Sequence, residues 1–179
     1  MIPKGPTLRP RHLRLLVLTT ALLAPCIAAA QSDKPVPDRP QDVASMNRQS
    51  LALAERGPAQ GWNVTPSGLR WRRVAGNGSG RHPGATDKVT VHYAGSFIDG
   101  TEFDSSIKRG EPATFPLNRV IKGWQEGVQL MGVGDKVEFA IPQDLAYGPN
   151  GRGPIPGGAT LLFTVELLAI QPADAATAP

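Results

Sequence analysis

Residues 118–132 read N-R-V-I-K-G-W-Q-E-G-V-Q-L-M-G and carry a helical pattern inside a region otherwise typical of strands and turns. Apolar side chains recur there at intervals of three and four residues, which places them on one helical face: Leu117, Ile121, Trp124 and Val128. Asn118 suits the N-cap, and Gly132 suits the C-terminal stop. The stretch therefore predicts one amphipathic helix over residues 118–132.

Two glycines, Gly123 and Gly127, stand four residues apart beside this apolar face. Glycine costs about 1 kcal/mol relative to alanine inside a helix. Their presence indicates that another element packs close to the helix backbone. A short helix that bears one large indole, in a chain rich in strands, is expected to lie across a curved sheet.

The sequence around this helix alternates between apolar and polar residues, as half-buried strands do. The alternation is clearest over residues 87–98, where Val89, Val91 and Tyr93 share one face. Asp99–Gly100 is a strong turn signal. Two prolines confine 111–117 to an edge or a bulge. The expected strands are 69–74, 87–98, 101–105, 111–117, 135–141 and 160–170.

These elements predict a single α+β domain over residues 62–170. Its fold is a curved antiparallel sheet of about five strands wrapped around one short helix. About 110 residues are ample for one hydrophobic core. Residues 145–158 are rich in glycine and proline and are expected to form a long loop. Residues 171–179 are polar and rich in alanine and proline, so we expect a disordered tail.

The first 30 residues have the pattern of a secretory signal peptide. Basic residues and no acidic ones precede the apolar run Leu15–Ala24, and Ala28–Ala30 offers a cleavage point before Gln31. The run is short for a membrane span, which makes a single-span anchor the weaker alternative. We expect cleavage near Ala30–Gln31, a periplasmic or secreted protein, and no integral membrane segment in the mature chain.

Loss of residues 1–30 changes the charge and the cysteine content. The whole chain has a formal charge of +4, and the segment carries four of its basic residues and no acid, so the remainder is close to neutral. The electrostatic basis for nucleic-acid binding is then missing. The one cysteine, Cys26, leaves as well, which excludes disulfides, thiol catalysis and thiolate metal sites. Cleavage before Cys26 with lipidation is the competing interpretation, although Pro25 stands where a small residue is expected.

Residues 31–61 are predicted to connect the signal segment to the domain. Residues 31–40 are proline-rich and read as an extended linker. Residues 41–56 predict a short helix that is capped by Asp42 and ends before Gly57–Pro58. Its apolar face would hold Val43, Met46, Leu53 and Ala54. We favour a loosely attached lead-in helix over a dimerisation arm, because one short segment buries little area.

Four motifs occur in order over about 110 residues: V89-T-V-H-Y-A-G-S-F-I-D-G-T-E-F-D-S-S106, F115-P-L-N-R-V-I-K-G-W-Q-E-G-V128, I141-P with L145-A-Y-G148, and I155-P-G-G-A-T-L-L-F-T-V-E-L-L168. Together they strongly resemble the FKBP-type peptidyl-prolyl cis-trans isomerases, and the chain is similar to bacterial, exported members. The resemblance implies the FKBP-like half-barrel fold.

The resemblance also implies the site. Residues expected to act in catalysis are Tyr93, Phe103, Asp104 and Tyr147. Residues expected to bind the substrate are Phe115, Val120, Ile121, Trp124, Ile155 and Phe163. Family likeness assigns the donors that hold the peptide carbonyls to the Tyr147 hydroxyl and the Ile155 backbone N–H. Ala113 stands where many members have a second aromatic residue, which implies a differently shaped wall. His92 is expected to be structural, and Lys108, Arg109 and Glu111 to form a solvated loop face.

The implied activity is isomerisation of X–Pro bonds during the folding of exported proteins. No bond is broken, so neither a cofactor nor a metal is expected. The site must instead bind the twisted amide better than either planar form. The expected partners are unfolded or partly folded proteins that contain proline, and macrolide inhibitors of the rapamycin type.

Two other classes of function stay open. A holdase chaperone would grip client segments with the same fold and without useful catalysis. A structural or adhesion domain would reuse the fold and would be expected to have a degraded pocket.

Overall fold

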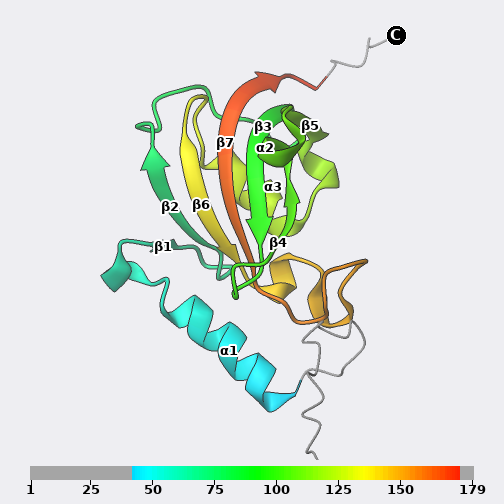
Figure 1. The fold of residues 1–179 in the computed structure, drawn as a ribbon. Coiled ribbons are helices and arrows are strands. Elements are labelled where there is room, and N and C mark those ends of the chain that lie inside the picture. Colours follow the sequence, from blue (N-terminus) through cyan, green and yellow to red (C-terminus); the bar gives the residue numbers. More distant parts are fainter. Residues whose placement is uncertain (1–41, 174–179) are drawn as a thin grey trace, which may run out of the picture. The chain divides into compact units, whose positions relative to one another are not determined.

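The computed structural model describes residues 42–173, all of which belong to one compact unit, Pro35–Pro179 (Figure 1). The predicted signal segment and the linker of residues 31–40 lie outside the described residues. Within residues 42–173, no helix is both long enough and apolar enough to cross a bilayer.

The described part of the chain forms one seven-stranded antiparallel sheet in the order β1-β2-β6-β7-β3-β4, and β5 also pairs with β3. Figure 1 shows β7 crossing the middle of this sheet as a long, bent strand. The strands are β1 (Asn63–Val64), β2 (Arg70–Ala75), β3 (Lys88–Ser96), β4 (Glu102–Ser105), β5 (Ala113–Pro116), β6 (Lys136–Ile141) and β7 (Leu161–Gln171).

The sheet has seven strands instead of about five: the six stretches predicted as strands, and β1 in addition. β1 has only two residues and gives no periodic signal. β4 and β5 pair with successive stretches of the same edge of β3: Ala94 lies opposite Ser105 in β4, and Val89 lies opposite Phe115 in β5. The prediction that the proline-containing segment runs along an edge is confirmed.

The described helices are α1 (Val43–Ala54), α2 (Ser106–Arg109) and α3 (Lys122–Gln129). Single 3₁₀ turns are η1 (Pro58–Gln60), η2 (Leu117–Arg119), η3 (Gln143–Leu145) and η4 (Gly148–Asn150). The last two lie in the predicted glycine- and proline-rich loop, so that loop holds local structure of its own.

The helix α3 is shorter than the predicted 118–132. Asn118 lies in η2, and Val120 is extended, with φ −98° and ψ 176°. The N-cap is Ile121, and the helix ends at Gln129. Asn118 is therefore not its N-cap, and Gly132 lies beyond its end. The predicted apolar face is nevertheless correct, because Leu117, Trp124 and Val128 are buried.

The two glycines of α3 let the helix approach the sheet closely. A Cβ on Gly123 would lie 2.4 Å from Ile141 Cγ2, and one on Gly127 would lie 2.6 Å from Phe139 Cε1. Both neighbours belong to β6. The prediction that an element packs against the helix backbone at these positions is confirmed.

The core lies between α3 and the sheet. Alternate residues of β3, β6 and β7 face it, as the sequence pattern predicted. Its fully buried members include Val89, Val91, Val128, Met131, Val137, Phe139, Ile141, Leu161, Val165 and Leu167. This rigid layer fixes the ends of the strands that carry the site.

The helix α1 begins as predicted, since Asp42 accepts a hydrogen bond from the Ser45 backbone N–H at 2.6 Å. Its predicted apolar face is correct only at Leu53, which is half-buried. Val43 and Met46 are 67% and 46% exposed, and Ala54 is exposed too. The other inward positions are Ser45, Gln49, Ala52 and Arg56. The Gln49 side chain accepts a hydrogen bond from Thr160 N–H at 2.8 Å. A polar anchor therefore sets the rotation of the helix.

The predicted tail at 171–179 begins later than expected. Gln171 is the last residue of β7, and it lies opposite Lys88 in the ladder. Two residues beyond it, the Ala173 N–H donates to Asp87 Oδ1 at 3.2 Å. Residues 174–179 lie outside the described part.

Candidate active site

A cavity of about 460 Å³ opens beside α3 and brings together residues from β3, β4, β5, β7, η2, α3 and the long loop. Its lining residues are Tyr93, Phe103, Asp104, Phe115, Arg119, Val120, Ile121, Trp124, Ala146, Tyr147, Arg152 and Phe163. Nine of the ten site residues inferred from the sequence lie in this set. The tenth, Ile155, does not.

Aromatic rings form the walls of the cavity around Trp124. The indole is 4% exposed and meets three rings edge-on. The ring centroids lie 5.3 Å from Tyr93, 6.0 Å from Phe115 and 5.3 Å from Phe163, with interplanar angles of 83–90°. Edge-to-face contacts of this kind stabilise aromatic pairs. The packing holds the indole as a fixed apolar surface at the cavity.

The strands place these rings by alternation. Tyr93 lies on the core-facing side of β3, and Phe163 lies on the core-facing side of β7. Gly95, opposite Phe163 in the ladder, gives the rings space: a Cβ there would lie 2.6 Å from the Phe163 ring and 2.8 Å from the Phe103 ring. A side chain at position 95 would push into the cavity wall.

One ionised network borders the cavity. Asp104 accepts hydrogen bonds from the Tyr93 hydroxyl, at 2.5 Å, and from Arg109 Nη1. Arg109 Nη2 also donates to the Tyr93 oxygen at 3.0 Å, and the guanidinium lies 5.5 Å from the Tyr93 ring centroid. The three side chains therefore hold one another in place.

The network shifts the pKa values of its members in opposite directions. Burial alone raises the pKa of Asp104, but the hydrogen bonds from Tyr93 and Arg109 and the charge of Arg109 outweigh it, and the pKa falls below its ordinary value. Burial, with the hydrogen bond to Asp104, raises the pKa of Tyr93. At neutral pH Asp104 is thus an anion and Tyr93 a neutral phenol.

The prediction that Arg109 is solvated is confirmed, since its side chain is 45% exposed, but the prediction missed its helical position and its partners. Arg109 closes α2 and folds back toward β4, where it forms an ion pair with Asp104. Ser105 caps that one-turn helix by accepting from the Lys108 N–H at 3.3 Å. The sequence did offer a signal for this ion pair. Ser105, the residue after Asp104, suits a helix N-cap, and a single helical turn from it brings Arg109 back toward Asp104. Lys108 itself pairs with Glu102.

The expectation for Ile155 is also wrong. Its N–H donates to the Arg152 carbonyl at 3.0 Å, and the Arg152 N–H donates back to the Ile155 carbonyl at 2.8 Å. The side chain is buried, at 8% exposure. Because both backbone groups bond within the loop, Ile155 anchors residues 152–155 and does not offer its N–H to the cavity.

Two other donors are available at the cavity. Ile121 lines it and precedes α3, and its backbone N–H has no hydrogen-bond partner among residues 42–173. The Tyr147 hydroxyl likewise bonds to no atom in the described part of the chain. Sequence reasoning identified both residues but not the Ile121 N–H. That group becomes visible only where the chain changes from extended to helical.

Three lining residues were not predicted: Arg119, Ala146 and Arg152. Both arginines are exposed. His92 lies on the opposite face of β3, with its Nδ1 3.1 Å from Ser106 Oγ, so its predicted structural role is supported. Among residues 42–173, no three His, Cys, Asp or Glu side chains gather closely enough to hold a metal ion.

Comparison with known proteins agrees with this geometry. The sequence profile described as FKBP-type peptidyl-prolyl cis-trans isomerase matches residues 79–168, about half of the chain. The chain belongs to the FKBP-type peptidyl-prolyl cis-trans isomerase family. The matched range contains every aromatic residue that lines the cavity. The FKBP-type domain thus carries the whole aromatic site, and α1 lies outside the matched range.

Curated relatives extend the likeness. The chain is 57% identical over 119 residues to FkpA of Aeromonas hydrophila, covering 66% of this chain and 44% of that protein. It is 56% identical over 119 residues to the FKBP-type 22 kDa isomerase of Escherichia coli K12, covering 66% and 57%. The chain therefore spans about half the length of the curated relatives it matches.

A solved structure shows the same fold over most of its length. The isomerase from Pseudomonas syringae pv. tomato superposes with a TM-score of 0.66 at 32% identity, covering 72% of this chain and 94% of that one. The α+β fold predicted from the sequence is confirmed.

Proposed function

We propose that this chain accelerates cis-trans isomerisation of X–Pro peptide bonds in unfolded or partly folded proteins. The observation that carries the proposal is the aromatic cavity around Trp124, which no side chain among residues 42–173 fills. Family membership supports the same reaction.

The reaction requires rotation about an amide with a barrier of about 18–20 kcal/mol. No atom is transferred, so catalysis depends on binding the twisted amide better than the planar one. Lowering the barrier by about 4 kcal/mol gives roughly a thousandfold acceleration. A shaped, pre-formed cavity can supply a difference of that size.

The apolar walls act on the charge distribution of the amide. Twisting removes resonance and lowers the charge separation between oxygen and nitrogen. A cavity of aromatic side chains solvates the planar dipole poorly and so favours the twisted form. The pyrrolidine ring would rest on the Trp124 indole and bury hydrocarbon there.

The polar groups would orient the peptide. The Tyr147 hydroxyl and the Ile121 N–H, both without partners in the described structure, are the donors that we assign to substrate carbonyls. Asp104 already accepts from Tyr93 and Arg109. We assign it an electrostatic role at the cavity border, where it stays ionised, and no role in proton transfer.

A protease-coupled assay with a short proline peptide tests the proposal. Protein 31–179 should accelerate isomerisation well above the spontaneous rate, and rapamycin should suppress the acceleration by occupying the cavity. Isomerisation at the background rate, with rapamycin bound, would leave the holdase function as the better account. Failure of both activity and rapamycin binding would exclude the prolyl cavity altogether.

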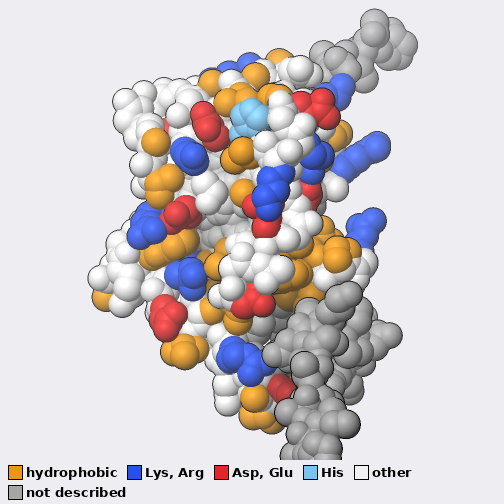
Figure 2. Space-filling model, in the orientation of Figure 1, with side chains coloured by type: hydrophobic (Ala, Val, Ile, Leu, Met, Phe, Trp, Pro, Cys, Tyr) orange, Lys and Arg blue, Asp and Glu red, His pale blue; other side chains and the backbone are white. Residues whose placement is uncertain are grey.

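We further propose that the protein acts outside the cytoplasm on exported clients. The support is the signal-peptide pattern of residues 1–30. Figure 2 shows acidic and basic side chains interspersed on the face in view, without the clustered basic patch that nucleic-acid binding requires. Mass spectrometry of the protein purified from its cell envelope should find Gln31 at the N-terminus. A lipidated Cys26 would instead establish a membrane anchor.

A further inference from the structure

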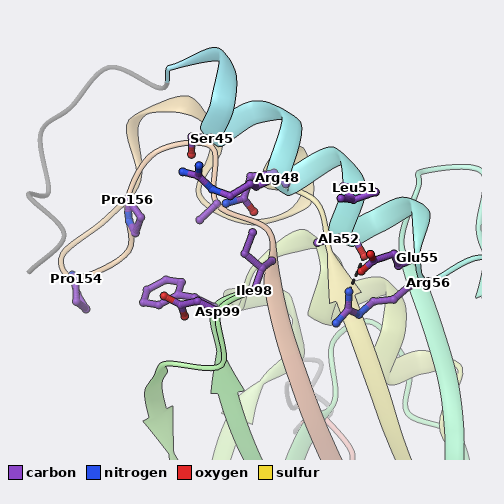
Figure 3. A pocket seen from close by; sticks show the side chains of 13 residues that line it. Ser45, Arg48, Leu51, Ala52, Glu55, Arg56, Ile98, Asp99, Pro154 and Pro156 are labelled. Atoms are coloured by element: carbon purple, nitrogen blue, oxygen red, sulfur yellow. Dashed lines mark hydrogen bonds between the residues drawn. The ribbon is translucent and has the colours of Figure 1, made fainter. Parts of the chain in front are cut away.

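A second cavity, of about 490 Å³, lies where α1 faces the loops of the FKBP-type domain. The helix α1 contributes Leu51 and Ala52, the β3–β4 turn contributes Phe97 and Ile98, and the long loop contributes Pro154 and Pro156. Figure 3 shows Ile98 and Asp99 rising from the turn toward the helix, with Pro154 and Pro156 on the neighbouring loop. We call this cavity the α1 groove.

One hydrogen bond between α1 and the start of β7 positions the helix beside the groove. The Gln49 side chain accepts from Thr160 N–H at 2.8 Å and fixes the helix to the start of β7. Arg56 donates to the Ala52 carbonyl at 2.6 Å, and its guanidinium carbon lies 6.0 Å from the Trp62 ring centroid. Leu51 lines the groove and remains 60% exposed, so the groove presents a largely uncovered apolar side chain.

The α1 groove adjoins the prolyl cavity. Phe97 lines the groove, Phe103 lines the prolyl cavity, and their ring centroids are 4.9 Å apart. On the other side, Arg152 lines the prolyl cavity, and Pro154, two residues later, lines the groove. Two neighbouring aromatic rings thus separate the cavities on one side, and a step of two residues along the loop separates them on the other. An extended chain advances about 3.4 Å per residue, so roughly three residues span this separation.

We propose that the α1 groove binds the segment of a client polypeptide that flanks the isomerised proline. The proposal rests on the proposed isomerase function of the adjoining cavity. The mixed lining suits an unfolded chain, because Leu51, Ile98 and the two prolines would cover apolar side chains while Arg48 and Asp99 lie at polar positions. The helix α1 thereby enlarges the binding surface from one prolyl residue to a longer segment.

The occupant could instead be a second copy of the chain docked on α1. Such a copy would be expected to cover the other exposed apolar side chains of the helix, Val43 and Met46, which do not line the groove. Met46 therefore provides a matched control for Leu51: both are large, apolar and exposed on the same helix, and only Leu51 lines the groove.

The test compares a four-residue proline peptide with peptides of the same core extended by six mixed apolar and polar residues on either side. For the wild-type protein, extension on one side should lower KM by about fivefold, the effect of partly burying one large aliphatic side chain. Leu51→Ser should abolish most of that gain. Met46→Ser should retain it. All three proteins should turn over the short peptide equally.

No gain on extension, or an equal loss in Leu51→Ser and Met46→Ser, would overturn the proposal. A dimer in light scattering that Leu51→Ser converts to a monomer would assign the groove to a second copy instead. If the wild-type protein turns over no peptide, the proposed function fails, and the groove is then judged by fluorescence-anisotropy Kd values for the labelled extended peptide. Equal Kd values for the two variants in that assay would exclude the groove as well.

Discussion

At the scale of one residue, the Tyr147 hydroxyl is available to bind substrate and contributes no hydrogen bond to the described fold. It enters the cavity from the long loop, and its hydroxyl bonds to no described atom of the chain. Tyr93, across the cavity, has the opposite situation, because its hydroxyl donates to Asp104 and accepts from Arg109. Two tyrosines in one cavity therefore differ in what their hydroxyl groups are available to do.

This difference predicts the result of removing each hydroxyl. Tyr147→Phe should lower kcat/KM by about fivefold, because one substrate hydrogen bond is worth roughly 1 kcal/mol. Its free energy of unfolding should stay within about 0.5 kcal/mol of the wild type. Tyr93→Phe should lower stability, because it leaves Asp104 and Arg109 each short of a partner. Peptide kinetics and urea unfolding on both variants check this, and a stability loss in Tyr147→Phe would contradict it.

Asp104 provides a pH-dependent prediction at the same scale. Its pKa lies below the ordinary value, because the bonds from Tyr93 and Arg109 outweigh burial. A group whose pKa is lowered on folding stabilises the fold above its unfolded pKa, and that contribution disappears as the pH falls through the folded pKa. Arg109→Gln should raise the pKa of Asp104, as followed by carboxyl ¹³C NMR. Arg119→Gln, which removes another cavity cation, is the control and should change it far less.

At the scale of elements, close packing of α3 on β6 outweighs helix propensity. Alanine in place of Gly127 would gain about 1 kcal/mol of propensity. Its Cβ, however, would lie 2.6 Å from the Phe139 ring. Overpacking of a core typically costs 1–3 kcal/mol.

We therefore expect Gly127→Ala to lower the free energy of unfolding by up to about 2 kcal/mol, measured by urea denaturation. Lys122→Ala, at an exposed position of the same helix, is the control and should be close to neutral. A more stable Gly127→Ala protein would show that the sheet moves away from the helix at little cost.

Asp135 joins β6 to the loop before β3. Its carboxylate is 2% exposed and accepts from Gly78 N–H at 2.9 Å, Gly132 N–H at 2.8 Å and Arg73 Nε at 3.0 Å. Burial raises the pKa of Asp135, but these hydrogen bonds and the charge of Arg73 lower it by more, so the pKa lies below its ordinary value. The stabilisation is therefore present above the unfolded pKa of about 3.9 and is lost as the pH falls through the lower folded value.

Asp135→Asn should cost about 3 kcal/mol at pH 7, because it removes the anion from a buried ion pair and turns one acceptor into a donor. Urea unfolding between pH 7 and pH 2 should show the gap to the wild type closing below about pH 4. The exposed Asp144→Asn is the control. If the difference in free energy of unfolding does not depend on pH, then packing and hydrogen-bond geometry, and not the charge of Asp135, connect the loop to β6.

Local patterns predicted those elements that local physics decides. Alternation located β3, β6 and β7 because each has one face on the core. The start of α3 was missed because Asn118 lies inside a 3₁₀ turn that is capped by Pro116, and Val120 then extends the chain. The buried face of α1 was missed because Gln49, a polar residue, anchors it through a partner 111 residues away. Hydropathy holds no information on such a contact.

At the scale of the whole molecule, the site was predictable as a set of residues but not as a set of contacts. Family motifs placed nine of the ten residues at the cavity. The Arg109 bridge and the internal bonding of Ile155 depend on how loops fold back. The α1 groove depends on three separate segments meeting, and no single stretch carries its signal.

Because α1 lines the α1 groove and contributes no residue to the prolyl cavity, deleting it should affect extended peptides and not short ones. Within the described residues, the helix adds one buried side chain, Ala52, and the bond from Thr160 to Gln49. A protein that begins at Gly57 should therefore lose only about 2–3 kcal/mol of stability, which lowers Tm by roughly 5–15 °C. Its kcat/KM for the short peptide should remain within about twofold of the wild type. The gain on extended peptides should vanish, because the deletion removes one wall of the α1 groove.

Circular dichroism melts and the two peptide assays on the same preparation check both halves of this prediction. An unfolded truncated protein would mean that α1 belongs to the folding unit and that its few contacts understate its contribution. A folded truncated protein that still gains from extension would place the flanking segment of the client elsewhere on the domain. If the truncated protein is folded and active and has the same KM for short and extended peptides, then the domain catalyses without α1, and α1 binds the flanking segment of the client.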